Sequence, residues 1–290
     1  MRLSELLQLA AGELKLAGIE EYALEARLLL EACLGKSRTE IFLLGQADVA
    51  EAEQSKFLGF ISRRKKREPV AYILGEQEFW SMPFWVSPAV LIPRPETEFL
   101  LDRILALADP ENLAKGALLD LCCGSGAIAT VLAKETGKRI IASDISPAAL
   151  EVTRSNLYRH GLAENVALVE ADLFSAFRMR RDFSLIVSNP PYVSRFELDN
   201  NLDPEVAKHE PRLALDGGAG GMDFILRICR EVPQFLCPSG QLFMEIGADQ
   251  GDAARVLFTE VRKDSLPFAK VDILVDYAGR DRVLHARMAQ

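Results

Sequence analysis

The sequence lacks a long hydrophobic run, and it is poor in cysteine and histidine. No apolar stretch approaches the roughly 20 residues that a membrane-spanning helix needs. Five cysteines and three histidines are spread over 290 residues, and no two cysteines are spaced as C-x-x-C. The odd number of cysteines argues against a disulfide framework, and their spacing argues against a zinc site. We therefore expect a protein of the reducing cytoplasm, without a membrane span and without a metal.

An excess of positive charge is also lacking. The 34 lysines and arginines are outnumbered by 42 aspartates and glutamates, so the formal net charge is −8. A negative balance argues against broad binding to nucleic acid, because phosphate backbones attract basic surfaces. The first 18 residues combine leucines at helical spacing with acids, and they lack the layout of a signal peptide. The composition, 49% hydrophobic and 26% charged, is typical of a globular protein.

The hydrophobic pattern changes near residue 70. Residues 2–66 carry helical patterns, with Gly35 as a stop after the second helix and a third helix over residues 50–67. Residues 72–92, YILGEQEFWSMPFWVSPAVLI, are rich in aromatic and β-branched residues and are interrupted by Gly75 and Pro83, which favours a β-hairpin. We predict a small helical bundle over residues 1–70, a hairpin linker over 71–92 and a larger domain over 93–290.

Helical and strand patterns alternate within the larger domain. Strands are predicted over 117–121, 139–144, 166–172, 185–188, 241–247, 270–279 and 281–288, and helices over 95–108, 127–136, 147–160, 221–233 and 250–261. Alternation of this kind implies parallel βαβ units in a doubly wound sheet. A glycine-containing turn joins the last two strands, which suggests an antiparallel edge hairpin. The predicted fold class is α/β, with a mostly parallel, seven-stranded sheet.

The first of these strands runs into a glycine-rich loop. The segment Asp120–Ala129 reads DLCCGSGAIA, and Gly124 and Gly126 allow the backbone to approach a ligand closely. The G-x-G-x-x-A spacing also fits a dinucleotide-binding fingerprint, so the loop alone is ambiguous. Asp120 favours a ligand with ammonium and sulfonium groups, such as S-adenosylmethionine, over one with a negatively charged pyrophosphate.

Polar residues follow the next three strands as well. Asp144 ends the second strand, where it can accept hydrogen bonds from ribose hydroxyls, although capping of the next helix explains it equally well. Asp172 follows the third strand and can accept a hydrogen bond from an adenine amino group, while Leu173 packs on the ring. The fourth strand ends in Asn189-Pro190-Pro191-Tyr192. A dinucleotide-binding function does not explain the Asn-Pro-Pro-Tyr segment after the fourth strand.

This order of motifs resembles the class I S-adenosylmethionine-dependent methyltransferases that act on an exocyclic or amide NH2 group. Three further runs, Glu78-Phe79-Trp80, Ile92-Pro93-Arg94-Pro95-Glu96-Thr97-Glu98 and His209-Glu210-Pro211, are similar to the peptide chain release factor glutamine methyltransferase family. The similarity extends over essentially the whole chain. Related sequences often have Gly-Thr where this chain has Cys122-Cys123, and we expect cofactor binding to survive because both loop glycines remain.

The resemblance implies methyl transfer from S-adenosylmethionine to the side-chain N5 of the glutamine in the Gly-Gly-Gln motif of bacterial class I release factors. The open alternatives are a glutamine methyltransferase of a large-subunit ribosomal protein and, with less support, a DNA or RNA amino-methyltransferase. The implied enzyme is monomeric and cytoplasmic, with a release factor as partner and with neither nucleic acid nor membrane. The predicted cofactor-binding residues are Asp120, Cys122, Cys123, Gly124, Ser125, Gly126, Asp144, Asp172, Leu173 and Asn189; substrate binding is assigned to Asn189, Pro190, Pro191 and Tyr192, and catalysis to Asn189, Pro190 and Tyr192.

The Asn-Pro-Pro-Tyr segment has the chemistry that an amide nucleophile requires. The amide nitrogen is a poor nucleophile, and its two hydrogens become better donors as it pyramidalises during attack. The side-chain oxygen of Asn189 and the backbone oxygen of Pro190 can accept them, which stabilises the transition state more than the ground state. The proline rings fix the backbone direction, and the ring of Tyr192 can hold the planar amide in line.

Other conspicuous residues have ordinary structural interpretations. The basic run Arg63–Arg67 can contact a ribosome or an acidic partner, but such a run is more often a solvated helix end. His160 and His209 have no partner spaced for metal binding or nucleophilic catalysis, so neither is predicted to be catalytic. The run Arg94–Glu98 can simply cap the next helix, whereas the family resemblance implies that it borders the cofactor cleft.

Overall fold

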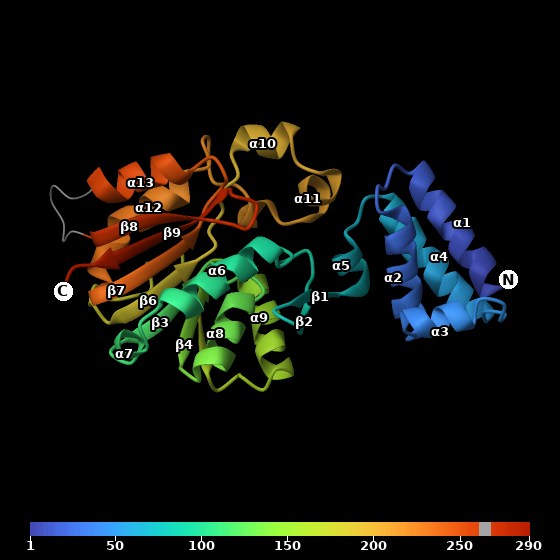
Figure 1. The fold of residues 1–290 in the computed structure, drawn as a ribbon, viewed down its shortest axis with the longest axis horizontal. Helices are drawn as coiled ribbons and strands as arrows, with labels where there is room; N and C mark the ends of the chain where they lie inside the picture. Colours follow the sequence, from blue (N-terminus) through green and yellow to red (C-terminus); the bar gives the residue numbers. More distant parts are fainter. Residues whose placement is uncertain (261–267) are drawn as a thin grey trace. The chain divides into compact units, whose positions relative to one another are not determined.

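A computed structural model describes residues 1–260 and 268–290 (Figure 1). The chain separates into two compact units, one of residues 1–76 with 203–209 and one of residues 77–202 with 210–290. This grouping divides the predicted linker 71–92 between the units: residues 71–76 belong to the helical unit and residues 77–92 to the other. The distant segment 203–209 also belongs to the helical unit.

The first unit is entirely helical apart from the first residue of β1. Leu29 and Leu30 of the second helix and Phe57 of the fourth are fully buried in its core, at the helical spacing seen in the sequence. Gly35 ends the second helix with φ of 61°, as its predicted role as a stop requires. The helices are α1 (Leu3–Leu16), α2 (Tyr22–Leu34), α3 (Arg38–Leu43), α4 (Glu51–Lys65), α5 (Val70–Leu74) and α11 (Pro204–His209).

The predicted hairpin begins later than its sequence pattern indicated. Residues 70–74 form α5, because Pro69 precedes a helical turn and Gly75 ends it in the left-handed region. Ile73 of this helix is buried in the core of the helical unit. The two-stranded sheet itself consists of β1 (Glu76–Phe79) and β2 (Met82–Trp85). Tertiary burial of one apolar side chain therefore overrides the β-propensity of the segment.

The basic run Arg63–Arg67 is neutralised inside the helical unit. Arg64 is 5% exposed, and its guanidinium lies 2.5 Å from Glu25 and 2.8 Å from Glu205. Arg67 also pairs with Glu205, at 3.2 Å, which ties α11 to this unit. Two further ion pairs join Arg63 to Glu68 and Lys65 to Glu13. Arg64 thus serves internal packing, whereas Arg63, Lys65 and Lys66 remain exposed, as in a solvated helix end.

The second unit contains the predicted doubly wound sheet. Its strands are β3 (Ala117–Leu121), β4 (Ile140–Asp144), β5 (Val166–Glu170), β6 (Phe183–Ser188), β7 (Leu236–Glu245), β8 (Phe268–Val275) and β9 (Asp281–Met288). The spatial order is β5-β4-β3-β6-β7-β9-β8; the first five are parallel, and β9 is antiparallel to both of its neighbours. The chain moves outward from β3 to β5 and restarts at β6. The topological switch point, where such sheets bind ligands, therefore lies between β3 and β6.

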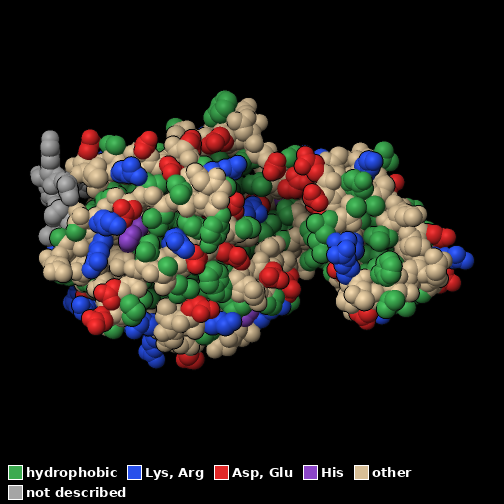
Figure 2. Space-filling view, viewed as in Figure 1, with side chains coloured by type: hydrophobic (Ala, Val, Ile, Leu, Met, Phe, Trp, Pro, Cys, Tyr) green, Lys and Arg blue, Asp and Glu red, His purple; other side chains and the backbone are tan. Residues whose placement is uncertain are grey.

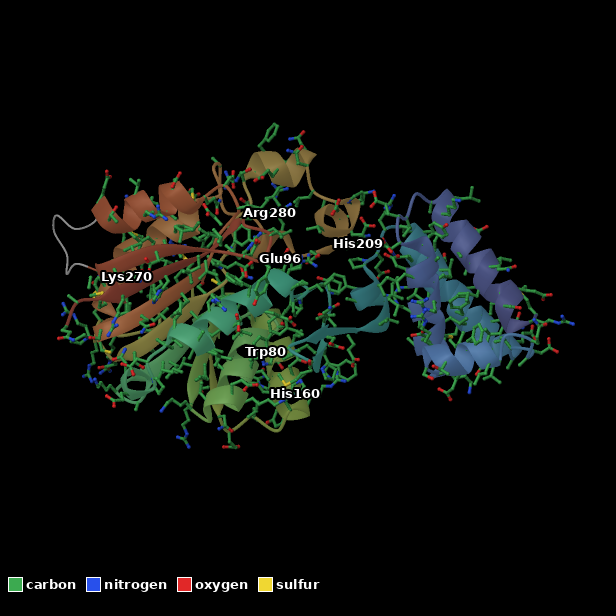
Figure 3. All side chains as sticks on the ribbon, viewed as in Figure 1. Trp80, Glu96, His160, His209, Lys270 and Arg280 are labelled. Atoms are coloured by element: carbon green, nitrogen blue, oxygen red, sulfur yellow. The ribbon has the colours of Figure 1, made fainter. Side chains whose placement is uncertain are left out.

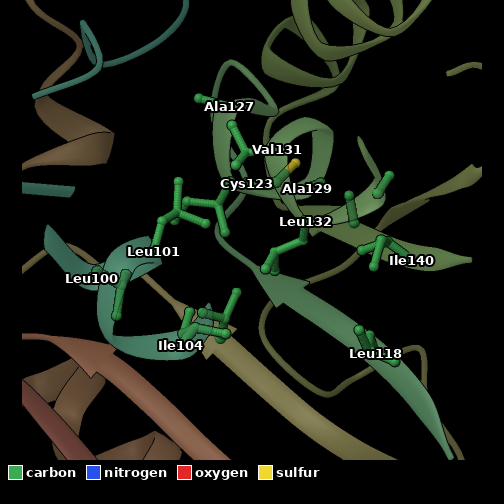
Figure 4. Packing of buried hydrophobic residues seen from close by; sticks show 14 of the residues in the cluster. Leu100, Leu101, Ile104, Leu118, Cys123, Ala127, Ala129, Val131, Leu132 and Ile140 are labelled. Carbon is green, nitrogen blue, oxygen red and sulfur yellow. The ribbon is translucent and has the colours of Figure 1, made fainter. Parts of the chain in front are cut away.

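Two apolar layers enclose this sheet. On one face, Leu100 and Ile104 of α6 (Pro95–Leu107) and Leu132 of α8 (Ala127–Thr136) pack with strand residues such as Leu118 and Ile140 (Figure 4). Helix α9 (Pro147–Arg159) covers the same face, while α12 (Asp223–Glu231) and α13 (Gly251–Glu260) cover the other. Each fully buried leucine contributes about 1.5–3 kcal/mol through the hydrophobic effect. These layers hold the strand ends rigidly in register.

The predicted elements of this unit lie close to the observed ones, with a few exceptions. The end of the predicted helix 250–261, Val261, lies outside the described residues. Short elements were not predicted: α7 (Pro110–Leu113), α10 (Arg195–Asn200) and the 3-10 turns η1 (Arg212–Ala214) and η2 (Val232–Gln234). No helix in the described part of the chain is long and apolar enough to cross a membrane.

The β-hairpin is anchored to the sheet domain by its turn and its second strand. The backbone N–H of Trp80 donates to Glu98 of α6 at 2.6 Å, and its indole N–H donates to Glu135 of α8 at 3.1 Å. A ring nitrogen of His160, at the end of α9, lies 2.9 Å from the Pro83 carbonyl oxygen. Figure 3 labels both Trp80 and His160. The hairpin run that carried the family resemblance therefore has a structural role.

Candidate active site

A cavity of about 320 Å³ lies at the carboxyl ends of β3, β4, β5 and β6. It is lined by residues from all four strand ends that the sequence singled out: Cys122, Cys123, Gly124 and Ser125, then Asp144, then Asp172 and Leu173, then Asn189 and Pro191. Asp120, Gly126, Pro190 and Tyr192 are not among the described residues that line it. The wall also includes Arg94 and Thr97, from the run that the family resemblance placed at the cofactor cleft. Val90, Leu213, Phe224 and Arg227 line it as well, and the sequence did not predict these.

The glycine-rich loop turns sharply at three alternate positions with left-handed backbone. Cys122, Gly124 and Gly126 have φ of 62°, 55° and 76°. A side chain at Gly126 would place its Cβ 2.4 Å from Cγ2 of Thr153, so this position requires glycine. Cys122 is a non-glycine residue in a left-handed conformation, which costs about 1–2 kcal/mol. This strain results from a cysteine standing where related sequences often have glycine.

Asp120 supports the loop from beneath. Its carboxylate is fully buried, Oδ2 accepts the backbone N–H of Ala129 at 3.0 Å, and Oδ1 has no hydrogen-bond partner among the described residues. Burial raises the pKa of Asp120 well above its usual range, because the charged form is poorly solvated. The geometry places this acid against the start of α8, one layer behind the cavity wall.

Asp144 and Asp172 occupy different electrostatic settings. The two oxygens of Asp144 accept the backbone N–H groups of Ser146 and Gly124, each at 2.9 Å, and burial raises the pKa of this carboxyl. An ionised carboxylate has about four acceptor positions, so Asp144 keeps capacity for ligand hydroxyls. Asp172 instead pairs with Arg227 of α12 at 2.8 Å. Sequence reasoning missed Arg227, since nothing in its helix marks it as a partner of a strand-end acid.

The Asn-Pro-Pro-Tyr segment is attached to a buried hydrogen-bond network. Asn189 donates through Nδ2 to Thr97 Oγ1 at 3.1 Å, and Thr97 donates to Glu245 Oε2 at 2.8 Å. The Tyr192 hydroxyl donates to Glu245 Oε1 at 2.9 Å. Burial raises the pKa of Glu245, and burial followed by the nearby Glu245 charge holds the pKa of Tyr192 well above its usual range. Sequence reasoning missed Glu245; its only signal was an acid inside the apolar strand QLFMEIG.

The run Arg94–Glu98 holds several parts of the site together. Arg94 forms an ion pair with Glu210, whose other oxygen accepts the backbone N–H of Ile92 at 3.2 Å. Thr97 enters the network described above, and Glu98 anchors the hairpin. The side chain of Arg94 makes no capping hydrogen bond at the start of α6. The run therefore joins the Asn189 side chain, the hairpin and the His-Glu-Pro segment, beyond any role in starting the helix.

The histidines are engaged in packing. His209 lies 3.2 Å from the Lys66 carbonyl oxygen within the helical unit, and His160 binds the hairpin; both are labelled in Figure 3. His285 stacks on Phe243 with ring centroids 4.2 Å apart. Among the described residues, no group of three or more histidine, cysteine, aspartate or glutamate side chains is placed to hold a metal ion.

The doubly wound sheet with its reversed β9 strand, together with the glycine-rich loop and the Asn-Pro-Pro-Tyr segment at its switch point, defines the class I methyltransferases. A solved methyltransferase from Pyrococcus furiosus shares this fold, with a TM-score of 0.52 and 15% sequence identity over 83% of this chain and all of that one. This likeness establishes the architecture of the second unit.

Sequence relatives then identify the family. A family model described as the PrmC N-terminal domain matches residues 5–75, and one described as the methyltransferase small domain matches residues 96–219. The release factor glutamine methyltransferase of Geobacter sulfurreducens is 38% identical over 96% of this chain and 93% of the relative. That of Koribacter versatilis is 38% identical over 99% of each chain. The chain belongs to the release factor glutamine methyltransferase family, which confirms the resemblance seen in the sequence.

Proposed function

We propose that this protein methylates the glutamine N5 of the Gly-Gly-Gln motif in bacterial class I release factors, with S-adenosylmethionine as the methyl donor. The observation that carries the proposal is the position of Asn189. Its amide nitrogen is occupied by Thr97, so its side-chain oxygen is available at the cavity. Full-length relatives that bear this activity in their names support the choice of substrate. A monomeric enzyme of the cytoplasm is part of the same proposal.

The cavity has the features that the methyl donor requires. When bound, S-adenosylmethionine supplies an electrophilic methyl group on a positively charged sulfur. Asp144 retains acceptor positions for ribose hydroxyls, and Leu173 offers an apolar surface to an adenine ring. The raised pKa of Asp144 marks a position in the cavity wall where a cationic ligand would favour the ionised carboxylate. The residues present therefore fit this donor.

Methylation of the substrate amide requires two hydrogen-bond acceptors for its N–H groups and does not require a strong general base. Its nitrogen must leave conjugation to attack, and its two N–H groups become stronger donors as positive charge develops. Asn189 Oδ1 and the Pro190 carbonyl oxygen can accept one hydrogen bond each, and preorganised acceptors of this kind stabilise the transition state. Pro190 is buried and the two proline rings restrict the backbone, so the carbonyl direction is set in advance. The alkylated nitrogen is acidic, and its proton can pass to water.

A nucleic-acid substrate fits this protein less well. Base-modifying enzymes normally present a basic surface along the bound strand. Figure 2 shows acidic and basic side chains interspersed over the visible face of the sheet-containing unit. The basic run of the helical unit is engaged with internal acids. We propose that the helical unit helps to dock the substrate protein, because the residues that line the cavity all belong to the other unit.

Labelled S-adenosylmethionine tests this function against its rivals. The protein is incubated with an intact release factor, the same factor with the Gly-Gly-Gln glutamine replaced by alanine, large-subunit ribosomal proteins, DNA and RNA. Label should appear only on the intact factor, and mass mapping should place it on that glutamine. Label on a ribosomal protein or on nucleic acid, with none on the release factor, would overturn the proposal. A short Gly-Gly-Gln peptide with a kcat/KM equal to that of the intact factor would refute the docking role.

A further inference from the structure

Glu245 is a buried carboxylate that lies behind the substrate amide site. It is the last residue of β7, only 1% exposed, and it touches Thr97 from α6 and Tyr192 from the loop after β6. Burying an ionised carboxylate is costly unless its surroundings require the charge. Both of its oxygens accept hydroxyl protons, so its hydrogen bonds are those of the ionised form. No step of the proposed chemistry yet uses this group.

The protons of the network have a single consistent arrangement. A threonine hydroxyl carries one proton, and Thr97 donates it in the hydrogen bond to Glu245. Thr97 Oγ1 can then serve Asn189 only as an acceptor. The asparagine must therefore turn Nδ2 inward and Oδ1 outward. The charge on Glu245 thus decides which end of the Asn189 amide faces the cavity.

We propose that Glu245 is a positioning residue whose ionised carboxylate, acting through Thr97, keeps the Asn189 side-chain oxygen facing the substrate. This inference rests on the proposed function, because the direction matters only if the nucleophile is an N–H donor. A neutral group at position 245 can donate to Thr97, which frees the threonine proton for Asn189 Oδ1. The flipped amide then presents NH2 to the substrate NH2, and two donors face each other. The Tyr192 hydroxyl, bound to the other carboxylate oxygen, is held by the same group.

The surrounding charges determine when Glu245 loses its proton. Burial raises the pKa of Glu245, and the nearby Glu96 of α6 acts in the same direction. The hydrogen bonds from Thr97 and Tyr192, and the Arg282 charge on β9, act to lower the pKa. The active form is ionised, so it is present above this raised pKa and lost as the pH falls through it. Methyl transfer should therefore weaken as the pH falls through this raised pKa.

Replacement of Glu245 by glutamine isolates the effect of the charge. Thr97 and Tyr192 bind different carboxylate oxygens, so the new amide presents its oxygen to one hydroxyl and its NH2 group to the other. Loss of one preorganised hydrogen bond at a transition state typically costs about 10²–10³-fold, and only the flipped fraction of Asn189 is inactive. We expect kcat with release factor to fall about 10–100-fold. The KM for release factor and the affinity for S-adenosylmethionine should change less than about threefold, and the Tm should stay equal or rise because a buried charge is removed.

Variants of Thr97 and a matched control test the relay itself. Thr97→Ser keeps the hydroxyl and should retain near wild-type kcat, whereas Thr97→Val keeps the shape without the hydroxyl and should resemble Glu245→Gln. Glu151→Gln makes the same acid-to-amide change on the surface of α9, where the carboxylate pairs with Arg154, and should leave kcat unchanged. As the pH is lowered, the ratio of wild-type to Glu245→Gln single-turnover rates should fall, because only the wild type loses the charge at position 245.

The outcomes separate this inference from the proposed function. Wild-type labelling of the release factor tests the function alone. If wild type methylates the glutamine and Glu245→Gln does so at near wild-type kcat, the positioning role is refuted while the function stands. Two further results would also refute it. One is a fall in the Tm of Glu245→Gln that accounts for its loss of activity, and the other is a ratio of wild-type to variant rates that stays constant as the pH is lowered until the protein unfolds.

Discussion

Asn189→Ala should remove nearly all turnover and leave the protein folded. The side chain is half-buried and makes one internal hydrogen bond, from Nδ2 to Thr97. Truncation leaves the Thr97 proton on Glu245, so no buried donor is stranded. The free energy of unfolding should fall by about 1 kcal/mol, the usual worth of one such bond. For a protein of this size that lowers the Tm by about 2–4 °C.

The catalytic loss should be much larger than the stability loss. Asn189 Oδ1 is one of two acceptors for the substrate amide, and the second, the Pro190 carbonyl, remains. Removing one preorganised partner of a developing charge costs about 2.7–4 kcal/mol, or about 10²–10³-fold in kcat. Single-turnover assays with saturating S-adenosylmethionine and release factor measure this step without interference from product release.

A second asparagine provides the control. Asn112 in α7 is 2% exposed, donates to the Ser239 carbonyl oxygen at 2.8 Å and lies outside the cavity wall. Asn112→Ala should destabilise the protein at least as much as Asn189→Ala and leave single-turnover rates unchanged. Methyl transfer by Asn189→Ala within about threefold of wild type would refute the acceptor argument, because the 10²-fold minimum expected for a lost acceptor would then be missing.

Three further predictions concern the cofactor loop and the sheet. Asp144→Ala should weaken S-adenosylmethionine binding by about 1.5–3 kcal/mol in calorimetry, and unchanged affinity in a folded variant would remove Asp144 from the site. Cys122→Gly should change the free energy of unfolding by less than about 1 kcal/mol, since relief of the left-handed strain offsets lost side-chain packing. Cys122→Val should lower the free energy of unfolding by about 2 kcal/mol in urea titrations. Equal stabilities of the two variants would contradict a strained backbone at this position. Burial lowers the pKa of His285 to about 4, so stability should be fully present above about pH 6.5 and fall by up to about 3 kcal/mol towards pH 4; His285→Gln should abolish this dependence, and an unchanged slope in that variant would exclude His285 as its source.

Local sequence patterns were enough to predict most of the secondary structure and the class of chemistry. The alternation of periods predicted seven strands, and β3 and α8 fall on the residues expected. The turn at Gly124 and Gly126 could be predicted because left-handed backbone is a local property of glycine. The role of Asn-Pro-Pro-Tyr could be predicted because its rigidity and its polar atoms are contained in four consecutive residues. Parallel strands also bring their carboxyl ends to one edge, so the strand-end residues could be expected to meet.

Only the tertiary structure decided which side chains serve one another. Thr97 and Glu245 are 148 residues apart, Arg94 and Glu210 are 116 apart, and no local pattern names either pair. Their contacts depend on strand register and on where α6 crosses the sheet edge, both of which follow from packing of the whole core. The same holds for the helical turn at residues 70–74, where burial of Ile73 outweighed local β-propensity. Sequence motifs specify the groups that can react, while the packed fold sets the partners that orient them.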